Sequence, residues 1–228
     1  MTNQISKSRK IVSLILKGIV VYFALSGTYK SVMSNTDTFM GGTNTLRFFT
    51  IQSNIGLAIV CMIGMYFLLR NKDIPYIWYV IKFVATLSIT LTGVVFCFVL
   101  APTFGEDAWN TVNIYTHVIV PIAAVIDFFV TGIDTEIKKN SVAYVGIPPI
   151  IYAFYAGYGY IKNWEFFPGA NYPYFFLNWG SPAGAFGFCN ELPFMGCMWW
   201  ILALLLFLII MGLIYLVILD WIKKVVRK

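Results

Sequence analysis

The sequence predicts an all-α integral membrane protein, a bundle of six membrane-spanning helices in a single domain over residues 1–228. Of its residues 59% are hydrophobic and only 11% are charged, and its mean hydropathy is +0.77. A soluble domain of this size is less apolar. Six stretches stay apolar over about 20 residues, the length that a helix needs to cross the hydrocarbon core, where backbone amides must pair internally.

The six spans are expected at residues 11–30, 47–69, 77–100, 113–133, 142–161 and 194–219. The first follows Lys7, Arg9 and Lys10, as in a secretory signal peptide. Its apolar run is long, however, and no small-residue cleavage site follows, so we expect a retained anchor. For the second span, the stretch "TNT" at residues 43–45 offers N-cap residues just before the helix.

Residues 162–193, between the fifth and sixth spans, form a long segment rich in Phe and Tyr and broken by Pro and Gly. It is too irregular to span the membrane and too apolar to lie free in water. One interpretation is a cover that lies along the outer interface over the bundle. The other is an aromatic belt that only sets the depth of the protein in the membrane.

The basic residues predict the orientation. With the N-terminus in the cytoplasm, only Lys30, Arg47 and Lys162 of the 16 Lys and Arg residues lie outside, and the rest, down to Arg227 and Lys228, lie inside. Cytoplasmic loops carry an excess of Lys and Arg, so both termini are expected in the cytoplasm. The net charge of +6 then reflects topology and attraction to anionic headgroups, and nucleic-acid binding is not expected.

The cysteines and sequence motifs indicate no cofactor. Cys61 and Cys97 lie inside predicted spans and are expected to pack as small apolar residues. Cys189 and Cys197 lie near the outer face, where a disulfide is one alternative that spacing alone does not decide. No zinc pattern, phosphate-binding loop or nucleotide fingerprint occurs in the sequence, so neither a metal nor an organic cofactor is expected.

His117, the only histidine, lies near the start of the fourth span. Ionisable groups in a membrane usually face the bundle interior and mark a site, although a histidine can also serve only to bond a neighbouring helix. The second and fourth spans both begin at the outer face, so Thr50 and His117 lie at similar depth, about 5–7 Å below their helix starts. We expect Thr50 to act as nucleophile and His117 as general base and acid.

The segment "RFFTIQSN", residues 47–54, adds polar side chains around Thr50. On a helix, Arg47, Thr50 and Asn54 share one face with Ser53 beside them, and this stripe is expected to turn inward. First-turn amides and Asn54 are expected to stabilise an oxyanion, and Arg47 to pair with a substrate carboxylate. Arg47, Ser53 and Asn54 are thus the predicted substrate-binding or oxyanion residues.

Three stretches, "RFFTIQSN", "THVIVPIAAVIDFF" and "YPYFFLN", carry a family resemblance. In span number and motif order, over nearly the whole chain, the sequence resembles the six-span androgen-induced and androgen-dependent TFPI-regulating membrane proteins, and more closely their bacterial relatives. The resemblance implies a threonine hydrolase of fatty acid esters of hydroxy fatty acids, with Thr50 and His117 at the matching positions, in a bacterial cell membrane. A more distant relative is a phospholipid acyltransferase with a cysteine nucleophile, and position 50 holds no cysteine.

Asp127 is a second ionisable group inside the fourth span. It lies ten residues beyond His117, about 15 Å deeper, which is too far to orient the imidazole. Lys82 and Lys17 reach a similar depth from the inner side. We expect a structural ion pair of Asp127 with Lys82 or Lys17, because a buried carboxylate is tolerated mainly when it is paired. A proton relay is the alternative.

Two other functional classes stay open. A small proton-coupled transporter or channel would also use an inward-facing set of His, Asp and Lys, although such carriers usually show inverted repeats, which the sequence lacks. A non-enzymatic lipid-binding protein would keep the pocket without needing the Thr50 hydroxyl. For the hydrolase, the expected partner is a lipid substrate from the bilayer. The sequence leaves the identity of this substrate and the oligomeric state undetermined.

Overall fold

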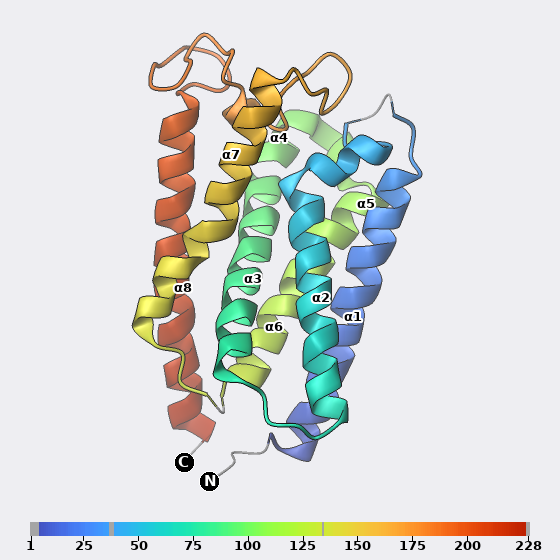
Figure 1. Ribbon diagram of the computed structural model, residues 1–228, viewed down its shortest axis with the longest axis vertical. Helices are drawn as coiled ribbons and strands as arrows, with labels where there is room; N and C mark the ends of the chain where they lie inside the picture. The colour runs from blue at the N-terminus through green and yellow to red at the C-terminus, as the bar shows by residue number, and fades with distance from the viewer. Residues whose placement is uncertain (1–4, 37–38, 134, 227–228) are drawn as a thin grey trace.

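The computed structural model describes residues 5–36, 39–133 and 135–226, which form an upright bundle of helices (Figure 1). Arg227 and Lys228, used above for the orientation, lie outside these residues. Five helical runs in the described chain are long and apolar enough to cross a membrane: Lys7–Val32 (α1), Phe49–Leu69 (α2), Tyr76–Phe104, Thr111–Gly132 and Cys197–Val226 (α8). The chain is therefore a multi-pass membrane protein. α1 begins and α8 ends at the same end of the bundle (Figure 1).

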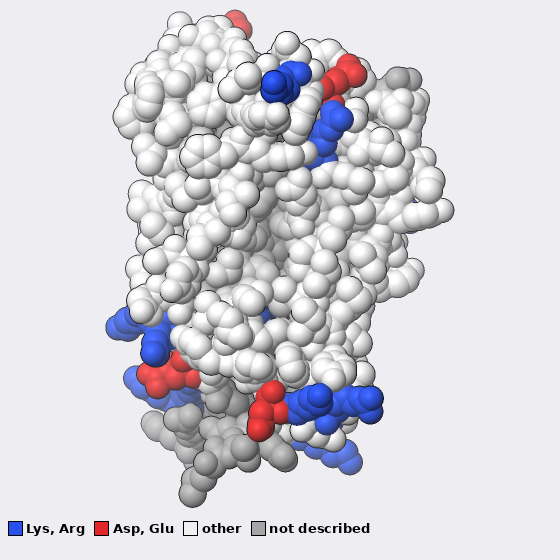
Figure 2. Space-filling model, viewed as in Figure 1, with Lys and Arg blue, Asp and Glu red and all other residues white. Residues whose placement is uncertain are grey.

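Charged residues are arranged as expected for a membrane protein. On the face drawn in Figure 2, Lys, Arg, Asp and Glu gather near the two ends of the molecule and leave a broad uncharged belt between them. Inside the bundle, one hydrophobic cluster joins α3 (Tyr76–Val95), η5 (Lys139–Gly146), α8 and the 162–193 segment, and a second joins α1, α2 and α6 (Val120–Gly132). The helices thus pack apolar side chains both against one another and toward the surrounding lipid.

Two of the spanning runs contain a widened turn. The third run consists of α3 (Tyr76–Val95), a π-helical turn η2 (Phe96–Leu100) and α4 (Ala101–Phe104). After η3 (Gly105–Trp109), the fourth consists of α5 (Thr111–Ile114), a π-helical turn η4 (Tyr115–Ile119) and α6 (Val120–Gly132).

A proline stands two residues beyond each π-helical turn, Pro102 and Pro121. The amide of Ala101 donates to Phe96 and that of Val120 to Tyr115, five residues back in each case. A proline ring lacks the amide hydrogen and collides with the carbonyl four residues back, which explains why the helix widens at these two places.

The predicted fifth span, residues 142–161, differs from a regular transmembrane helix. It consists of a 3₁₀ helix η5 (Lys139–Gly146) followed by α7 (Ile147–Ile161), which has 15 residues. Pro148 and Pro149 occupy the first turn of α7. Because proline is accepted in the first turn but not in a helix interior, α7 begins here, and the chain before it forms the 3₁₀ helix η5. α7 alone is therefore shorter than the about 20 residues of a span.

The segment of residues 162–193, which we call the cover segment, lies over the end of the bundle opposite to the start of α1 (Figure 1). It contains a short 3₁₀ helix, η6 (Phe175–Leu177). Four of its apolar side chains are buried in the main hydrophobic cluster: Phe166, Tyr174, Phe176 and Leu177. The segment therefore packs into the bundle and does not only lie at its edge, which agrees with the cover interpretation.

The four cysteines are free thiols. Cys189 in the cover segment donates to the carbonyl of Glu191 at 3.2 Å, and Cys197 is buried at the start of α8. The alternative of a disulfide between Cys189 and Cys197 is therefore not realised in this structure.

Asp127 on α6 forms a buried charge cluster with two lysines. Lys17 Nζ on α1 donates to both carboxylate oxygens, at 2.8 and 2.9 Å. Lys82 Nζ on α3 donates to the second carboxylate oxygen and to the backbone carbonyl of Asp127. Ser13 and Thr131 accept one further hydrogen bond each, from Lys17 and Lys82 respectively. Each ammonium group thus has protein acceptors for its hydrogens.

This cluster ties together α1, α3 and α6 in the half of the bundle near the chain ends. Asp127, Lys17 and Lys82 are at most 1% exposed. The carboxylate is the counter-ion for both ammonium groups, so its loss would leave two buried positive charges without compensation. The geometry supports the structural role that the sequence favours for these residues.

We predict that Asp127→Asn lowers the free energy of unfolding by about 3–5 kcal/mol, the usual effect of removing one partner of a buried ion pair. Lys17→Met is expected to cost less, because Lys82 and Asp127 then remain as a neutral pair. Thermal unfolding of the purified protein in detergent measures both. The control is Asp220→Asn, whose carboxylate is 57% exposed beside Lys223. Equal stability of Asp127→Asn and this control would contradict the structural role.

Candidate functional site

Thr50 is the second residue of α2, at the end of the bundle beneath the cover segment. α2 begins at Phe49, and its N-cap residue is Phe48, which has an extended backbone and offers no side-chain cap. The prediction that residues 43–45 cap this helix is wrong. They lie in a separate 3₁₀ helix, η1 (Thr43–Arg47), in which the hydroxyl of Thr45 bonds that of Ser31 at 2.7 Å.

The structure brings Thr50 and His117 together. Thr50 Oγ1 lies 3.3 Å from His117 Nε2. Both residues are buried, at 4% and 3% exposure. A distance of 3.3 Å is long for a hydrogen bond, and catalytic hydrogen bonds are commonly long before substrate binds.

The other ring nitrogen of His117 decides which tautomer is present. Nδ1 lies 3.2 Å from the carbonyl oxygen of Asn113, which can only accept. It also lies 3.0 Å from Thr116 Oγ1, whose own hydrogen is donated to the carbonyl of Val112. Both neighbours therefore require the proton on Nδ1. Nε2 is then unprotonated and accepts the hydrogen of the Thr50 hydroxyl.

The two π-helical turns hold the imidazole in place. Phe96 in η2 stacks on the ring of His117 in η4, with centroids 3.9 Å apart and planes at 20°. Gly93, one turn before Phe96, allows the two helices to approach: a Cβ there would lie 2.9 Å from the carbonyl oxygen of His117. The imidazole is thus fixed by stacking on one face and by hydrogen bonds at both nitrogens.

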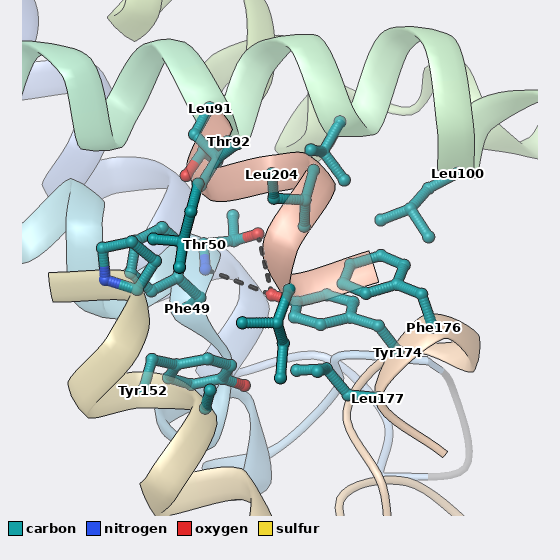
Figure 3. A pocket seen from close by; sticks show the side chains of 15 residues that line it. Phe49, Thr50, Leu91, Thr92, Leu100, Tyr152, Tyr174, Phe176, Leu177 and Leu204 are labelled. Carbon is teal, nitrogen blue, oxygen red and sulfur yellow. Dashed lines mark hydrogen bonds between the residues drawn. The ribbon is translucent and has the colours of Figure 1, made fainter. Parts of the chain in front are cut away.

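Tyr174 of the cover segment is a site residue that the sequence analysis did not identify. Its hydroxyl accepts the backbone amide of Thr50 at 3.3 Å and lies 3.4 Å from Thr50 Oγ1 (Figure 3). It thus fills the place of a helix cap from 124 residues away. Burial raises the pKa of the Tyr174 phenol, so it stays protonated at neutral pH. The tyrosine lies within the stretch "YPYFFLN", but no sequence pattern assigns it to Thr50.

Arg47 does not take the predicted position beside Thr50. Because it ends η1 and is not part of α2, it does not share the helical face of Thr50. Its guanidinium donates to the carbonyl of Glu165 at 2.6 Å and lies over the ring of Trp164. The arginine thus fastens the cover segment, and the predicted shared face of Arg47, Thr50 and Asn54 is wrong for Arg47.

Asn54 and Ser53 lie next to Thr50 on α2, and both bond its carbonyl oxygen. The Asn54 amide donates to Thr50 at 2.8 Å and to the carbonyl of Thr116 at 3.2 Å. Ser53 donates to Thr50 at 3.0 Å and bonds the hydroxyl of Thr92 at 2.9 Å. The amide hydrogens of Asn54, predicted as an oxyanion donor, are used in joining α2 to the turn that carries His117. Both residues therefore position the site.

A small cavity adjoins Thr50 (Figure 3). Its volume is about 60 Å³, and its polar lining side chains are Thr50, Thr92, Tyr152 and Tyr174. Leucines, Phe49 and Phe176 provide much of the rest of the wall. His117 does not line this space. The cavity has room for a few water molecules but not for a lipid.

The described residues contain no group of three His, Cys, Asp or Glu side chains arranged to hold a metal ion. No protein-family model, no curated protein and no solved structure matches this chain. The family resemblance of the sequence motifs therefore stays a prediction.

We predict that Gly93→Ala destabilises the protein by about 1–3 kcal/mol, the usual cost of overpacking, because the new methyl group would press on the His117 carbonyl and on Pro121. Gly56→Ala on α2 is the matched control, since a Cβ there has no neighbour within 4 Å. This control is expected to be neutral or slightly stabilising. Thermal unfolding of both variants in detergent measures the difference, and equal effects would contradict the close approach at Gly93.

Proposed function

We propose that the protein is an intramembrane lipid ester hydrolase with Thr50 as nucleophile and His117 as general base and acid. The observation that carries the proposal is the buried pair of Thr50 Oγ1 and His117 Nε2, with the Nδ1 neighbours holding the tautomer that a base requires. A hydroxyl beside a base that a third group orients is the usual arrangement for nucleophilic acyl transfer.

In the first step, Thr50 Oγ1 attacks the ester carbonyl carbon while His117 Nε2 takes the hydroxyl proton. The resulting tetrahedral intermediate collapses as its bond to the alkoxy oxygen breaks. The imidazolium returns the proton to that oxygen, and the alcohol leaves. In the second step, a water molecule gives one proton to Nε2 and attacks the acyl-threonine. The acid leaves as the proton returns to Thr50 Oγ1.

The negative charge of each intermediate needs hydrogen-bond donors. We assign this role to the Tyr174 hydroxyl and the Thr50 amide, which lie together at the N-terminal end of α2, where the helix dipole also favours negative charge. In the resting state these two groups bond each other. The oxyanion would replace that mutual bond and receive a hydrogen from each.

The proposed setting is a six-span protein with both termini in the cytoplasm. η5 and α7 together run along the bundle (Figure 1), and their combined rise is about 38 Å, enough to cross about 30 Å of hydrocarbon. The Lys and Arg distribution supports this orientation. The site then opens toward the outer leaflet of the membrane. The resemblance suggests that this is a bacterial cell membrane. Fatty acid esters of hydroxy fatty acids are the substrates that the resemblance suggests.

We predict that a fluorophosphonate probe labels the wild-type protein in membranes and fails to label Thr50→Ala, because the modified oxygen is absent. His117→Ala is expected to be labelled far more slowly, since no base removes the proton. Thr92→Ala is the matched control: this threonine lines the same cavity but does not bond His117. Labelling is measured by in-gel fluorescence, and unchanged labelling of Thr50→Ala would reject the nucleophile.

We further predict that Tyr174→Phe lowers kcat for ester hydrolysis about 100-fold, as expected for loss of one oxyanion donor. Tyr152→Phe is the control. This tyrosine also lines the cavity, but its hydroxyl donates to the carbonyl of Arg47 at 3.1 Å. It is expected to change kcat little and stability by about 1 kcal/mol. Steady-state kinetics on a chromogenic ester distinguish the two, and similar kcat values for both variants would remove Tyr174 from the mechanism.

A further inference from the structure

A long groove runs along the bundle between α2 and α7, with α3 as its floor. α7 packs mainly against η5, η6 and α8, which leaves its side toward α2 open. The groove has a volume of about 870 Å³, within the range of ligand sites. It opens sideways, and Figure 2 shows a hollow in the uncharged belt of the face drawn there.

The lining of this groove is apolar over its length and polar at its ends. Its middle is formed by Gly56, Leu57, Val60, Val80, Ile81 and Val84. Gln52, Ser53 and Tyr155 lie at the end nearer the cover segment, and Tyr76, Lys138 and Ser141 lie at the other. Along α3 the groove extends from Tyr76 to Ser88, about 18 Å. An elongated apolar ligand fits this distribution.

The groove meets the site at two aromatic side chains. Phe49 and Tyr152 line both the groove and the cavity beside Thr50. Their ring centroids are 5.2 Å apart, so together they form the partition between the two spaces. The cavity of about 60 Å³ holds no acyl chain. A lipid ester whose carbonyl reaches Thr50 must therefore keep its chain elsewhere, and the groove is directly beyond the partition.

We propose that this groove binds the acyl chain of the membrane ester, with the carbonyl group at Thr50 and the chain entering the groove at Phe49 and Tyr152 and extending along α3. The inference rests on the proposed hydrolase function. Two features identify the occupant. The groove opens sideways in the uncharged belt, where lipid chains surround the protein, and it adjoins the cavity beside Thr50 at Phe49 and Tyr152.

Gly56 provides a direct way to block the groove. It lies on α2 in the groove wall, and a Cβ built on it meets no atom within 4 Å. Gly56→Trp therefore places an indole in the groove without a collision in the helix packing. Gly18 on α1 is the matched control, because its Cβ position is equally open and it lines neither the groove nor the cavity beside Thr50. Gly18→Trp adds the same side chain to another mid-helix glycine.

The experiment uses a palmitate ester that carries a diazirine near the middle of its chain and an alkyne at its end. The full-length Thr50→Ala protein, reconstituted in nanodiscs, is irradiated with this probe, and the labelled residues are found by mass spectrometry. Labels are expected on Val80, Ile81 and Val84. They should fall at least about tenfold in the double variant with Gly56→Trp and stay unchanged with Gly18→Trp.

Turnover in the otherwise wild-type protein gives a second measurement. Gly56→Trp is expected to lower the ratio of kcat/KM for 4-nitrophenyl palmitate to kcat/KM for 4-nitrophenyl acetate about tenfold, because only the long chain needs the groove, and Gly18→Trp is expected to leave this ratio unchanged. Labels outside the groove, or equal labelling with Gly56→Trp and Gly18→Trp, would overturn the proposal. Groove labelling that Gly56→Trp abolishes, in a protein that hydrolyses neither ester, would keep the acyl-chain site and reject the hydrolase.

Discussion

A polar group inside the hydrocarbon core has no water to bond, and this constraint governs the two buried polar clusters of the bundle, around Asp127 and around His117. Around Asp127 it is met by bringing two lysines and a serine to one carboxylate, with Thr131 accepting a further hydrogen from Lys82. Around His117 it is met by a carbonyl and a hydroxyl at Nδ1 and by the Thr50 hydroxyl at Nε2. The two clusters differ in whether one of their polar side chains also borders a cavity. In the first, each polar hydrogen has a protein acceptor, whereas in the second Thr50 also borders a cavity.

The second cluster depends on the two widened turns. A π-helical turn rotates the residues that follow it relative to a regular helix, and such turns occur frequently at functional sites. Here η2 and η4 lie in neighbouring helices and place Phe96 directly against His117. Pro102 and Pro121 give a chemical cause for both turns, and Gly93 removes the side chain that would keep the two helices apart. Thus three residues without polar side chains shape the backbone that carries the single histidine and its stacking partner.

The sequence predicted the elements whose cause is local. Long apolar runs indicated the five helical runs of full length, and equal depth from one membrane face was enough to pair Thr50 with His117. Arg47 was misplaced because the helix begins two residues after it, at a boundary that depends on Phe48 and on the preceding 3₁₀ helix. The shortened α7 had a visible cause in the sequence, Pro148 and Pro149. The position of Tyr174 had no such cause in the sequence, because its contact with Thr50 joins residues 124 positions apart and arises only when the cover segment packs on the bundle.

The depth of Thr50 fits the conflicting needs of the proposed reaction. An ester in a membrane brings an apolar chain, whereas its hydrolysis consumes water, which the hydrocarbon excludes. Thr50 lies in the first turn of α2, under a cover segment that Arg47 fastens to η1 and Tyr174 fastens to α2. On its other side, Phe49 and Tyr152 separate it from a groove open to lipid. A nucleophile at this level can receive a chain from the side and water from the end, and a position two or three turns deeper would lose the second route.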